Sequence, residues 1–423
     1  INTKKLVTEK IEETSGGITF SLDDKYIFYS KLDSNHRPRK IFRHRLGTSP
    51  KDDELIFEEK SEAFTVSIGL SSDEKYFFIT TSDHNTSEQY YFNVNDNNPK
   101  PRLIKKRKKG ILYSVNSWNG KFYNHTNEDA EDFKIDITDN LNEQKWKSFI
   151  PAKEEVLIGG LTFLNNWIIR SETSDALDKL FVKNLKTEIE EELTFSDEKV
   201  YVPGVSLIQR SKDTDEIYLG YSSPKTQSRV YLYNLATKKK KLVKEQIIPS
   251  GHNPSDYIVE RIDCKSHDGR MVPLTITRHK NTKIDGSANL LLYGYGSYGS
   301  SMSPSFSSTR LSLIDRNIIW VTAHIRGGME RGMKWWKEGK LLNKKNTFED
   351  YIAAAKYLID KKYTSKNKII GMGGSAGGLL MGAVVNQAPE LFLGIIMAVP
   401  FVDSLTTNLD HSLPLTVGEF DEF

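Results

Sequence analysis

The chain has 423 residues, of which 38% are hydrophobic and 11% aromatic. That length predicts more than one domain, and that composition argues against a disordered chain. The 59 Lys and Arg residues nearly balance the 56 Asp and Glu residues, whereas a dedicated nucleic-acid binder usually has a stronger basic excess. The single cysteine, Cys264, excludes a disulfide framework and a cysteine-based metal site, and it fits a reducing compartment.

The N-terminal segment INTKKLVTEK is polar and has no signal-peptide hydrophobic region. No apolar run reaches the roughly 18 residues that a membrane helix needs. We therefore expect a cytoplasmic protein, a monomer or a weak homo-oligomer, with no nucleic acid, membrane, metal or cofactor among its partners. Because the chain begins with Ile rather than Met, we also expect its natural start to lie upstream.

A repeat marks the first 250 residues. Short strand-like runs, each after a turn-forming cluster, recur every 45 to 50 residues, and their matching positions are Tyr26, Tyr76, Phe122, Trp167 and Ile217. A period of about 40–50 residues with several strands per unit is typical of a β-propeller blade. The alternative is a β-sandwich with irregular strand spacing. We predict propeller blades over residues 1–250.

The pattern changes after about Pro249. A hairpin with its turn at residues 267–269 is followed by buried-type strands that alternate with helices predicted at 347–362 and 376–387. Continuous apolar strands separated by helices indicate a parallel sheet that is covered on both faces. The first helix has an apolar stripe and a predicted N-cap at Asn346 or Thr347. Residues 251–423 are therefore predicted to form an α/β domain.

Two basic runs, residues 105–109 and 238–241, could contact nucleic acid or act as a nuclear signal. Each lies between predicted strands, so we favour solvated loops.

Residues 373–377, GGSAG, match the G-x-S-x-G pattern around a nucleophilic serine. The motif follows an apolar strand and opens a helix, which is the context that a nucleophile elbow requires. Glycines two residues before and after Ser375 avoid collisions in so sharp a turn. Ser375 would then precede a helix whose first backbone N–H, that of Ala376, points at a developing oxyanion. The alternative is a glycine-rich packing turn with an idle serine.

Residues 294–299, GYGSYG, match G-x-G-x-x-G after a strand. A dinucleotide site would need a helix to start at once, and the following SSMSPSFSS does not supply one, although Asp315 lies about where a ribose-binding acid could be. We favour a loop whose Tyr295 hydroxyl donates to the oxyanion beside the Ala376 amide.

Ser375 also needs a histidine base oriented by an acid, and in α/β-hydrolases these follow in the order Ser, Asp, His. Of the nine histidines only His411 lies downstream, and its polar neighbours favour a surface loop. We therefore expect the 423 residues to end before the triad is complete, so that this chain by itself is inactive.

Several longer motifs together resemble a known family: LLYGYGSYG, AHIRGG, EGKLLNKKNTFEDY, MGGSAGGLLMGAVVNQAPELF, AVPFVD and PLTVGEFDEF. They are similar to the oligopeptidase B group of the prolyl oligopeptidase family of serine peptidases. The resemblance is nearly gapless over residues 289–423 and weaker in the first 250. It implies a seven-bladed β-propeller with an α/β-hydrolase domain, both incomplete in this chain. The sequence differs from the family pattern at Met329, Asp421 and Phe423.

The resemblance also implies roles for single residues. Ser375 matches the nucleophile and Tyr295 the oxyanion tyrosine, while Glu419 and Asp421 match the carboxylates that bind a P1 Arg or Lys. Phe401 matches an aromatic wall of that pocket. Carboxylates with an aromatic face suit a guanidinium, although the segment GEFDEF alone would read as a solvated acidic terminus. With one residue between them, the two acids could point the same way on an extended segment.

The predicted function is a serine oligopeptidase that hydrolyses short peptides after Arg or Lys through an acyl-enzyme on Ser375. The alternatives are a prolyl- or acylaminoacyl-type peptidase or esterase, and a propeller scaffold with an inactive hydrolase fold. The acidic pair disfavours the first group, because an acidic pocket would not select a neutral side chain.

Overall fold

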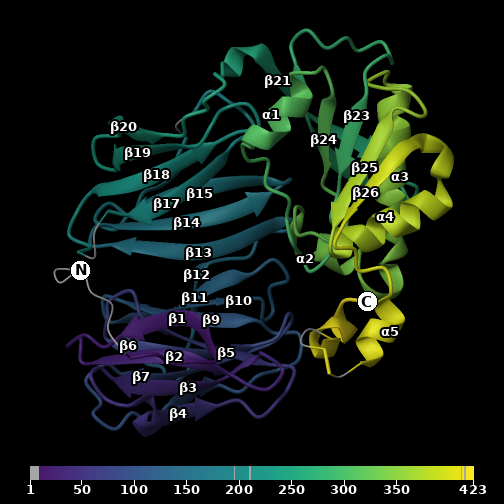
Figure 1. Cartoon of the computed structure of the whole chain (residues 1–423). Helices are drawn as coiled ribbons and strands as arrows, with labels where there is room; N and C mark the ends of the chain where they lie inside the picture. Colours follow the sequence, from purple (N-terminus) through teal and green to yellow (C-terminus); the bar gives the residue numbers. More distant parts are fainter. Residues whose placement is uncertain (1–8, 195, 209–210, 411, 414–415) are drawn as a thin grey trace. The chain divides into compact units, whose positions relative to one another are not determined.

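The computed structural model describes residues 9–194, 196–208, 211–410, 412–413 and 416–423 (Figure 1). The chain divides into two compact units, Ile1–Ala152 with Leu405–Asp421, and Lys153–Ser404 with Glu422–Phe423. This division differs from the predicted domain boundary at residues 250 and 251, which stays a prediction. The last propeller-type strand ends at Glu245 and the first strand of the α/β sheet begins at Tyr257, so the change of architecture falls between them.

The described residues of the first unit form three antiparallel sheets of four strands each, and every sheet is a meander of consecutive strands. Their strands are β1 (Thr14–Phe20), β2 (Tyr26–Leu32), β3 (Pro38–Arg45) and β4 (Glu54–Glu58); β5 (Thr65–Leu70), β6 (Tyr76–Ser82), β7 (Ser87–Asn93) and β8 (Arg102–Lys105); and β9 (Tyr113–Trp118), β10 (Lys121–Thr126), β11 (Lys134–Thr138) and β12 (Lys147–Ile150).

The second unit contributes two more sheets of the same kind. They consist of β13 (Val156–Leu164), β14 (Trp167–Ser174), β15 (Leu177–Asn184) and β16 (Glu190–Glu192), and of β17 (Val202–Leu207), β18 (Glu216–Ser222), β19 (Arg229–Asn234) and β20 (Lys240–Glu245).

The five residues that define the sequence repeat each lie at the first or second position of the second strand of a sheet. Separate four-stranded meanders of this kind confirm propeller blades and exclude the β-sandwich alternative. The inner strands are largely buried because neighbouring sheets pack on each other, whereas outer strands such as β16 and β20 are exposed. Between the first two sheets, for example, Phe28 packs against Phe77 with ring centroids 4.6 Å apart, and both side chains are buried.

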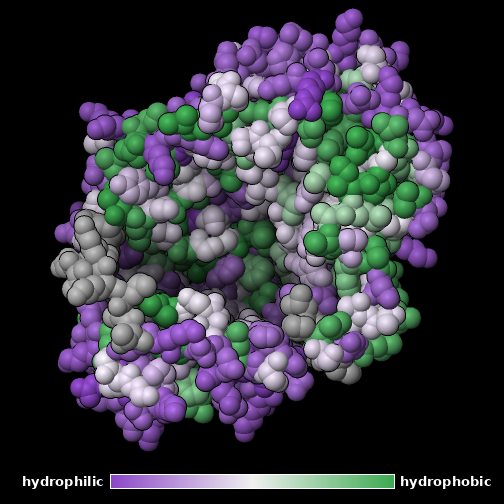
Figure 2. All heavy atoms as spheres, viewed as in Figure 1, coloured by the Kyte–Doolittle hydropathy of each residue, from purple (hydrophilic) through white to green (hydrophobic). Residues whose placement is uncertain are grey.

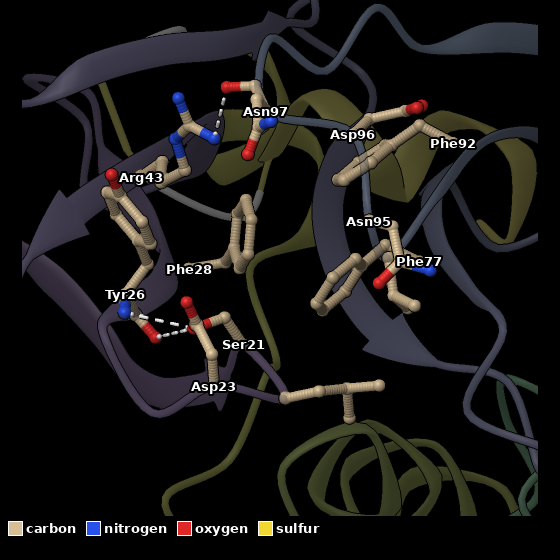
Figure 3. A pocket seen from close by; sticks show the side chains of 12 residues that line it. Ser21, Asp23, Tyr26, Phe28, Arg43, Phe77, Phe92, Asn95, Asp96 and Asn97 are labelled. Atoms are coloured by element: carbon tan, nitrogen blue, oxygen red, sulfur yellow. Dashed lines mark hydrogen bonds between the residues drawn. The ribbon is translucent and has the colours of Figure 1, made fainter.

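A pocket of about 300 Å³ lies between these first two sheets (Figure 3). Phe28 and Phe77 form part of its wall, and Arg43 donates to the Asn97 carbonyl at 3.0 Å. Arg43 is also bonded to Glu54, at 2.5 Å. Because this cation already has partners within the protein, the pocket does not point to a ligand.

The α/β part of the second unit is a six-stranded sheet in the order β21-β22-β24-β23-β25-β26. The pairs β21–β22 and β22–β24 are antiparallel, and the other three pairs are parallel. The predicted hairpin is confirmed as its first two strands. The bounds are β21 (Tyr257–Lys265), β22 (Met271–His279), β23 (Leu290–Tyr293), β24 (Ile319–Ala323), β25 (Ile369–Gly374) and β26 (Phe392–Ala398).

The helices of the chain include α1 (Ser308–Ile314), α2 (Gly332–Lys337), α3 (Lys345–Asp360), α4 (Ala376–Gln387) and α5 (Ser404–Leu409). The 3-10 segments are η1 (Pro50–Asp52), η2 (Pro254–Asp256), η3 (Leu341–Asn343), η4 (Pro389–Leu391) and η5 (Thr416–Asp421). None of the helices in the described part of the chain is long and apolar enough to cross a membrane.

Alternate residues of β24 show that helices cover both faces of the sheet. Ile319 and Val321 belong to the main core with α3 and α4, whereas Trp320 packs with α1 on the opposite face. The predicted apolar stripe of α3 is confirmed. Its predicted N-cap is wrong, because the helix begins earlier, and the Asn346 and Thr347 side chains donate instead to carbonyls of Glu338, Arg326 and Gly339.

The strand β26 is an edge strand among the described residues, and its outer side is apolar. Leu393 is 60% exposed and Val399, just past the strand, is 85% exposed. Figure 2 shows the resulting hydrophobic area over β25 and β26. Exposed edge strands with apolar side chains are prone to pair with other chains.

A buried ion pair connects α3 to the segment after β24. The side chains of Asp350 and Arg326 are 0% and 1% exposed, and Asp350 accepts from the Arg326 backbone N–H at 3.0 Å and from its guanidinium at 2.6 and 2.8 Å. Asp350 also accepts from the Ser266 hydroxyl at 2.5 Å. Arg326 also donates to Asp268 at 2.5 Å, but Asp268 is partly exposed, so Asp350 is the fully buried partner of this charge.

We expect Asp350→Ala to lower the free energy of unfolding by about 3–5 kcal/mol, since it leaves the Arg326 charge buried without its main partner. Urea titration followed by circular dichroism measures this as a lower midpoint at constant slope. The matched control is Glu349→Ala, at the half-buried neighbouring position, for which we expect a change within about 0.5 kcal/mol. A loss below about 1 kcal/mol for Asp350→Ala would contradict the ion-pair argument.

Candidate active site

Ser375 lies in the turn between β25 and α4. Its backbone has φ +55° and ψ −119°, a conformation that non-glycine residues rarely adopt, and its side chain is exposed. Such strain persists only where the surroundings over-determine it, and it is typical of a nucleophile elbow. The predicted strand–turn–helix context of GGSAG is confirmed.

The two outer glycines of the motif are required by close packing. A Cβ on Gly373 would lie 2.2 Å from the Gly377 carbonyl oxygen, so the strand and the helix can approach this closely only without side chains. A Cβ on Gly377 would lie 3.0 Å from the Gly294 carbonyl oxygen and 3.3 Å from Cδ2 of Tyr295. Gly377 therefore makes room for the loop of residues 294–299, which we call the tyrosine loop. This close approach places Tyr295 against the first turn of α4.

Three backbone hydrogen bonds fix the turn. The Ser375 N–H donates to the Ala398 carbonyl at 2.9 Å, and the Ser375 carbonyl accepts from the N–H groups of Gly378 at 2.8 Å and Phe401 at 3.0 Å. Ala376 is the first residue of α4, so its N–H has no carbonyl of a preceding helical turn to bond. This arrangement leaves the Ala376 N–H available beside an exposed hydroxyl.

The GYGSYG loop continues from β23 towards Ser375. The Gly294 N–H donates to the Met372 carbonyl of β25 at 3.1 Å, and Gly296 has φ +73°. The next helix, α1, begins only at Ser308, so the geometry that a dinucleotide would need is not met. Asp315 is the C-cap of α1, and it accepts from the Tyr257 hydroxyl at 2.7 Å.

Phe401 forms an aromatic cluster with Phe423 and Tyr298. The ring centroids of Phe401 and Phe423 are 5.3 Å apart, and those of Phe423 and Tyr298 are 5.7 Å apart. The N–H of Phe401 bonds to the Ser375 carbonyl, so the cluster is connected directly to the nucleophile turn.

The acidic pair does not lie on an extended segment, and that part of the sequence prediction is wrong. Glu419 and Asp421 belong to η5, and residues two apart in a 3-10 helix point about 120° apart. Glu419 is 8% exposed. Asp421 is more exposed and accepts from Nζ of Lys109 at 3.2 Å.

His411 lies outside the described residues. Within those residues the hydroxyl of Ser375 has no hydrogen-bond partner. No group of three or more His, Cys, Asp or Glu side chains in the same part of the chain could bind a metal ion.

The sequence analysis missed Glu422 and Lys344, which both contact the tyrosine loop. Glu422 is 1% exposed and accepts from the Tyr298 N–H at 2.7 Å. Lys344 donates to the Gly296 carbonyl at 2.6 Å. No local sequence pattern indicated a role for either residue, because Glu422 stands in an acidic segment and Lys344 in the lysine pair of NKKN. Only the contacts in the fold reveal them.

The basic run at residues 105–109 is not a purely solvated loop. Arg107 bonds to Glu59 at 2.8 Å and lies 3.3 Å from Glu88, with its guanidinium 4.2 Å from the Phe64 ring centroid. Both glutamates are buried, so they need this cation. The charge of Arg107 therefore compensates two buried carboxylates within the first compact unit.

Comparison with known proteins identifies the family. The model for "Prolyl oligopeptidase, N-terminal beta-propeller domain" matches residues 1–246, and that for the "Prolyl oligopeptidase family" matches residues 304–423. The chain belongs to the prolyl oligopeptidase family. It is thus a β-propeller followed by an α/β-hydrolase domain.

Two curated members are similar over the whole chain. Protease 2 of Moraxella lacunata is 36% identical over 100% of this chain and 61% of its own length. Dipeptidyl aminopeptidase BI of Pseudoxanthomonas mexicana is 34% identical over 100% of this chain and 58% of its own length. The chain thus spans about 60% of the length of these relatives.

Solved structures show the same relationship. Oligopeptidase B from Trypanosoma brucei, in a closed form with covalently bound antipain, superposes with a TM-score of 0.94 at 31% identity, covering 99% of this chain and 61% of the other. Oligopeptidase B from Leishmania major gives a TM-score of 0.93 at 29% identity, with coverage of 99% and 60%.

Proposed function

We propose that this protein is a serine oligopeptidase that hydrolyses short peptides after Arg or Lys, through an acyl-enzyme on Ser375. The observation that carries the proposal is the strained, exposed Ser375 at the N-terminus of α4, with the Tyr295 loop packed against Gly377. Family membership, with relatives named protease 2 and oligopeptidase B, supports the same reaction class.

In the proposed reaction, the Ser375 hydroxyl oxygen attacks the peptide carbonyl carbon and its proton passes to a histidine base. The negative charge that develops on the carbonyl oxygen accepts hydrogen bonds from the Ala376 N–H and the Tyr295 hydroxyl. The base then donates its proton to the leaving amine, and water hydrolyses the acyl-enzyme in a second, equivalent step. No cofactor or metal is needed for these steps.

Selection of a basic P1 residue would depend on Glu419, Asp421 and Phe401. The low exposure of Glu419 supports this role, because a carboxylate attracts a cation more strongly where water is excluded. Phe401 supplies an aromatic face next to the turn that carries Ser375. We expect Arg to be preferred over Lys, since its planar guanidinium can use both oxygens of one carboxylate.

The test is a comparison of kcat/KM on N-blocked peptides that differ only at P1, with Arg, Lys, Pro or Ala, using protein made from the whole coding sequence. We expect Arg to exceed Lys, and to exceed Ala by about 100-fold or more. A fluorophosphonate probe followed by peptide mapping should place the label on Ser375.

Other results of this panel point to the alternatives. Equal cleavage after Pro or Ala would overturn the basic specificity and favour a prolyl- or acylaminoacyl-type activity. Cleavage only of unblocked peptides, with release of dipeptides, would indicate an aminopeptidase like the Pseudoxanthomonas relative. Absence of both cleavage and labelling would support the inactive scaffold.

A further inference from the structure

We propose that Lys344 and Glu422 are positioning residues that fix the loop of residues 294–299 and thereby present Tyr295 to the oxyanion. We call this pair the loop clamp. The inference rests on the proposed function, because the role of Tyr295 belongs to it. All of the contacts that carry it lie within the second compact unit.

Lys344 bonds to the loop immediately after Tyr295. Its ammonium donates to the Gly296 carbonyl at 2.6 Å and to the Ser297 hydroxyl at 2.5 Å. Ser297 is fully buried, so its hydroxyl has no access to water. The same ammonium lies 5.2 Å from the ring centroid of Phe423, a distance at which a cation is attracted to an aromatic face. Lys344 therefore fixes two consecutive residues of the loop.

Glu422 bonds to the other end of the loop. One carboxylate oxygen accepts from the Tyr298 N–H at 2.7 Å, and the other accepts from Nε1 of Trp336 in α2 at 2.9 Å. The Glu422 carbonyl accepts from the N–H of Leu341 at 3.0 Å. Both oxygens accept hydrogen bonds from residues of the second unit and the side chain is 1% exposed, so we assign Glu422 to the loop and not to the substrate.

The two charges of the loop clamp favour each other. Burial lowers the pKa of Lys344 to about 8, and the carboxylate of Glu422 acts in the opposite direction. The ammonium form therefore predominates at neutral pH and supplies the donors that the loop carbonyl and hydroxyl accept. Removing either member takes this favourable interaction away from the other, largely buried charge.

The loop needs such external bonds because of its backbone. Gly296, Tyr298 and Gly299 all have positive φ, at +73°, +57° and +65°. For Tyr298 this conformation is unfavourable, since its Cβ crowds the backbone. Without bonds from the surrounding structure the segment would relax to other conformations.

Tyr295 lies between two anchors. Gly294 is bonded to β25 through the Met372 carbonyl, and Gly296 is bonded to Lys344. The hydrogen bond from Gly294 to Met372 extends the sheet and does not involve Lys344 or Glu422. The second anchor depends on one lysine side chain, so the direction in which Tyr295 leaves the backbone depends on it too. Misplacement of a catalytic group by about 1 Å can cost about 100-fold in rate.

The test uses Lys344→Met and Glu422→Gln, with Lys345→Met as the matched control because Lys345 is the exposed neighbour. Hydrogen exchange of the peptide that contains residues 294–300 is measured first, on the 423-residue chain. We expect faster exchange of this peptide in both clamp variants, with the β25 peptide and the Lys345→Met protein unchanged.

Kinetics in protein made from the whole coding sequence separate positioning from general stability. We expect kcat to fall about 10- to 100-fold in the clamp variants, while KM changes less than about threefold. A peptide arginine aldehyde, whose adduct with serine carries the oxyanion, should lose affinity by a similar factor. The corresponding arginine alcohol, which forms no adduct, should bind as it does to the wild type.

Unchanged exchange of the loop, or equal losses for aldehyde and alcohol, would overturn the loop clamp. If Lys344→Met does not fold, Ser297→Ala removes one acceptor of Lys344 with both charges in place, and a slowed kcat with unchanged alcohol binding is again expected. Failure of the proposed function would look different. In that case the wild type itself would not cleave Arg peptides, and it would bind the aldehyde no more tightly than the alcohol.

Discussion

Replacing Ser375 by Ala is expected to reduce kcat/KM for a P1-Arg peptide by about 10⁶-fold in protein made from the whole coding sequence. The hydroxyl oxygen is the atom that forms the acyl-enzyme in the proposed reaction, and removal of a serine nucleophile typically costs this much. Substrate binding should persist, because Ala fits the same turn and no proposed P1 contact is altered. The measurement is a progress curve at high enzyme concentration, with inhibitor titration as a check on binding.

The matched control is Ser365→Ala. Ser365 precedes β25 whereas Ser375 follows it, so the two positions are at opposite ends of one strand. We expect this control to keep activity within about twofold. If Ser375→Ala retained more than about 1% of the wild-type rate, another group would be the nucleophile and the elbow would have only a structural role.

The organisation of both domain types was predictable because it depends on patterns that are local in sequence. Residues such as Tyr26 and Phe122 recur at a spacing of one blade, since every blade repeats the same meander. The nucleophile elbow was predictable for a similar reason. Its strand, turn and helix are contiguous, and the turn requires Gly373 and Gly377 whatever the rest of the chain does.

Contacts between distant segments were not predictable from sequence. Glu422 stands in an acidic segment that resembles a solvated terminus, yet it is bonded to Tyr298 and Trp336, which lie far from it in sequence. Arg107, likewise, stood in a run of basic residues, but two buried glutamates require its charge. The energy of a buried charge depends on which partners the fold brings to it, and composition does not contain this information.

The acidic pair shows a second kind of limit. The resemblance to a family supplied the roles of Glu419 and Asp421, but the expected extended backbone was wrong because the segment forms η5. One residue between two acids is compatible with a strand or with a 3-10 helix, and polar sequences favour neither strongly. The two carboxylates consequently differ in environment, one buried and one bonded to Lys109. This difference makes the two positions unequal in the predicted effect of mutation.

Glu419→Gln is expected to weaken transition-state binding of P1-Arg substrates by roughly 2–4 kcal/mol, or about 30- to 1,000-fold in kcat/KM. Gln has nearly the same size, so the substitution removes the charge at a site that is only 8% exposed, where a charge-assisted pair is poorly screened. Asp421→Asn is expected to cost less, because Asp421 is more exposed and already has Lys109 as a partner. The measurement is kcat/KM on the four matched P1 peptides for the wild type and both variants, since loss of a specific cation contact should lower the Arg and Lys values and leave those for Ala unchanged. An intact Arg preference in Glu419→Gln, or equal losses on the Arg and Ala peptides, would show that the cation is bound elsewhere.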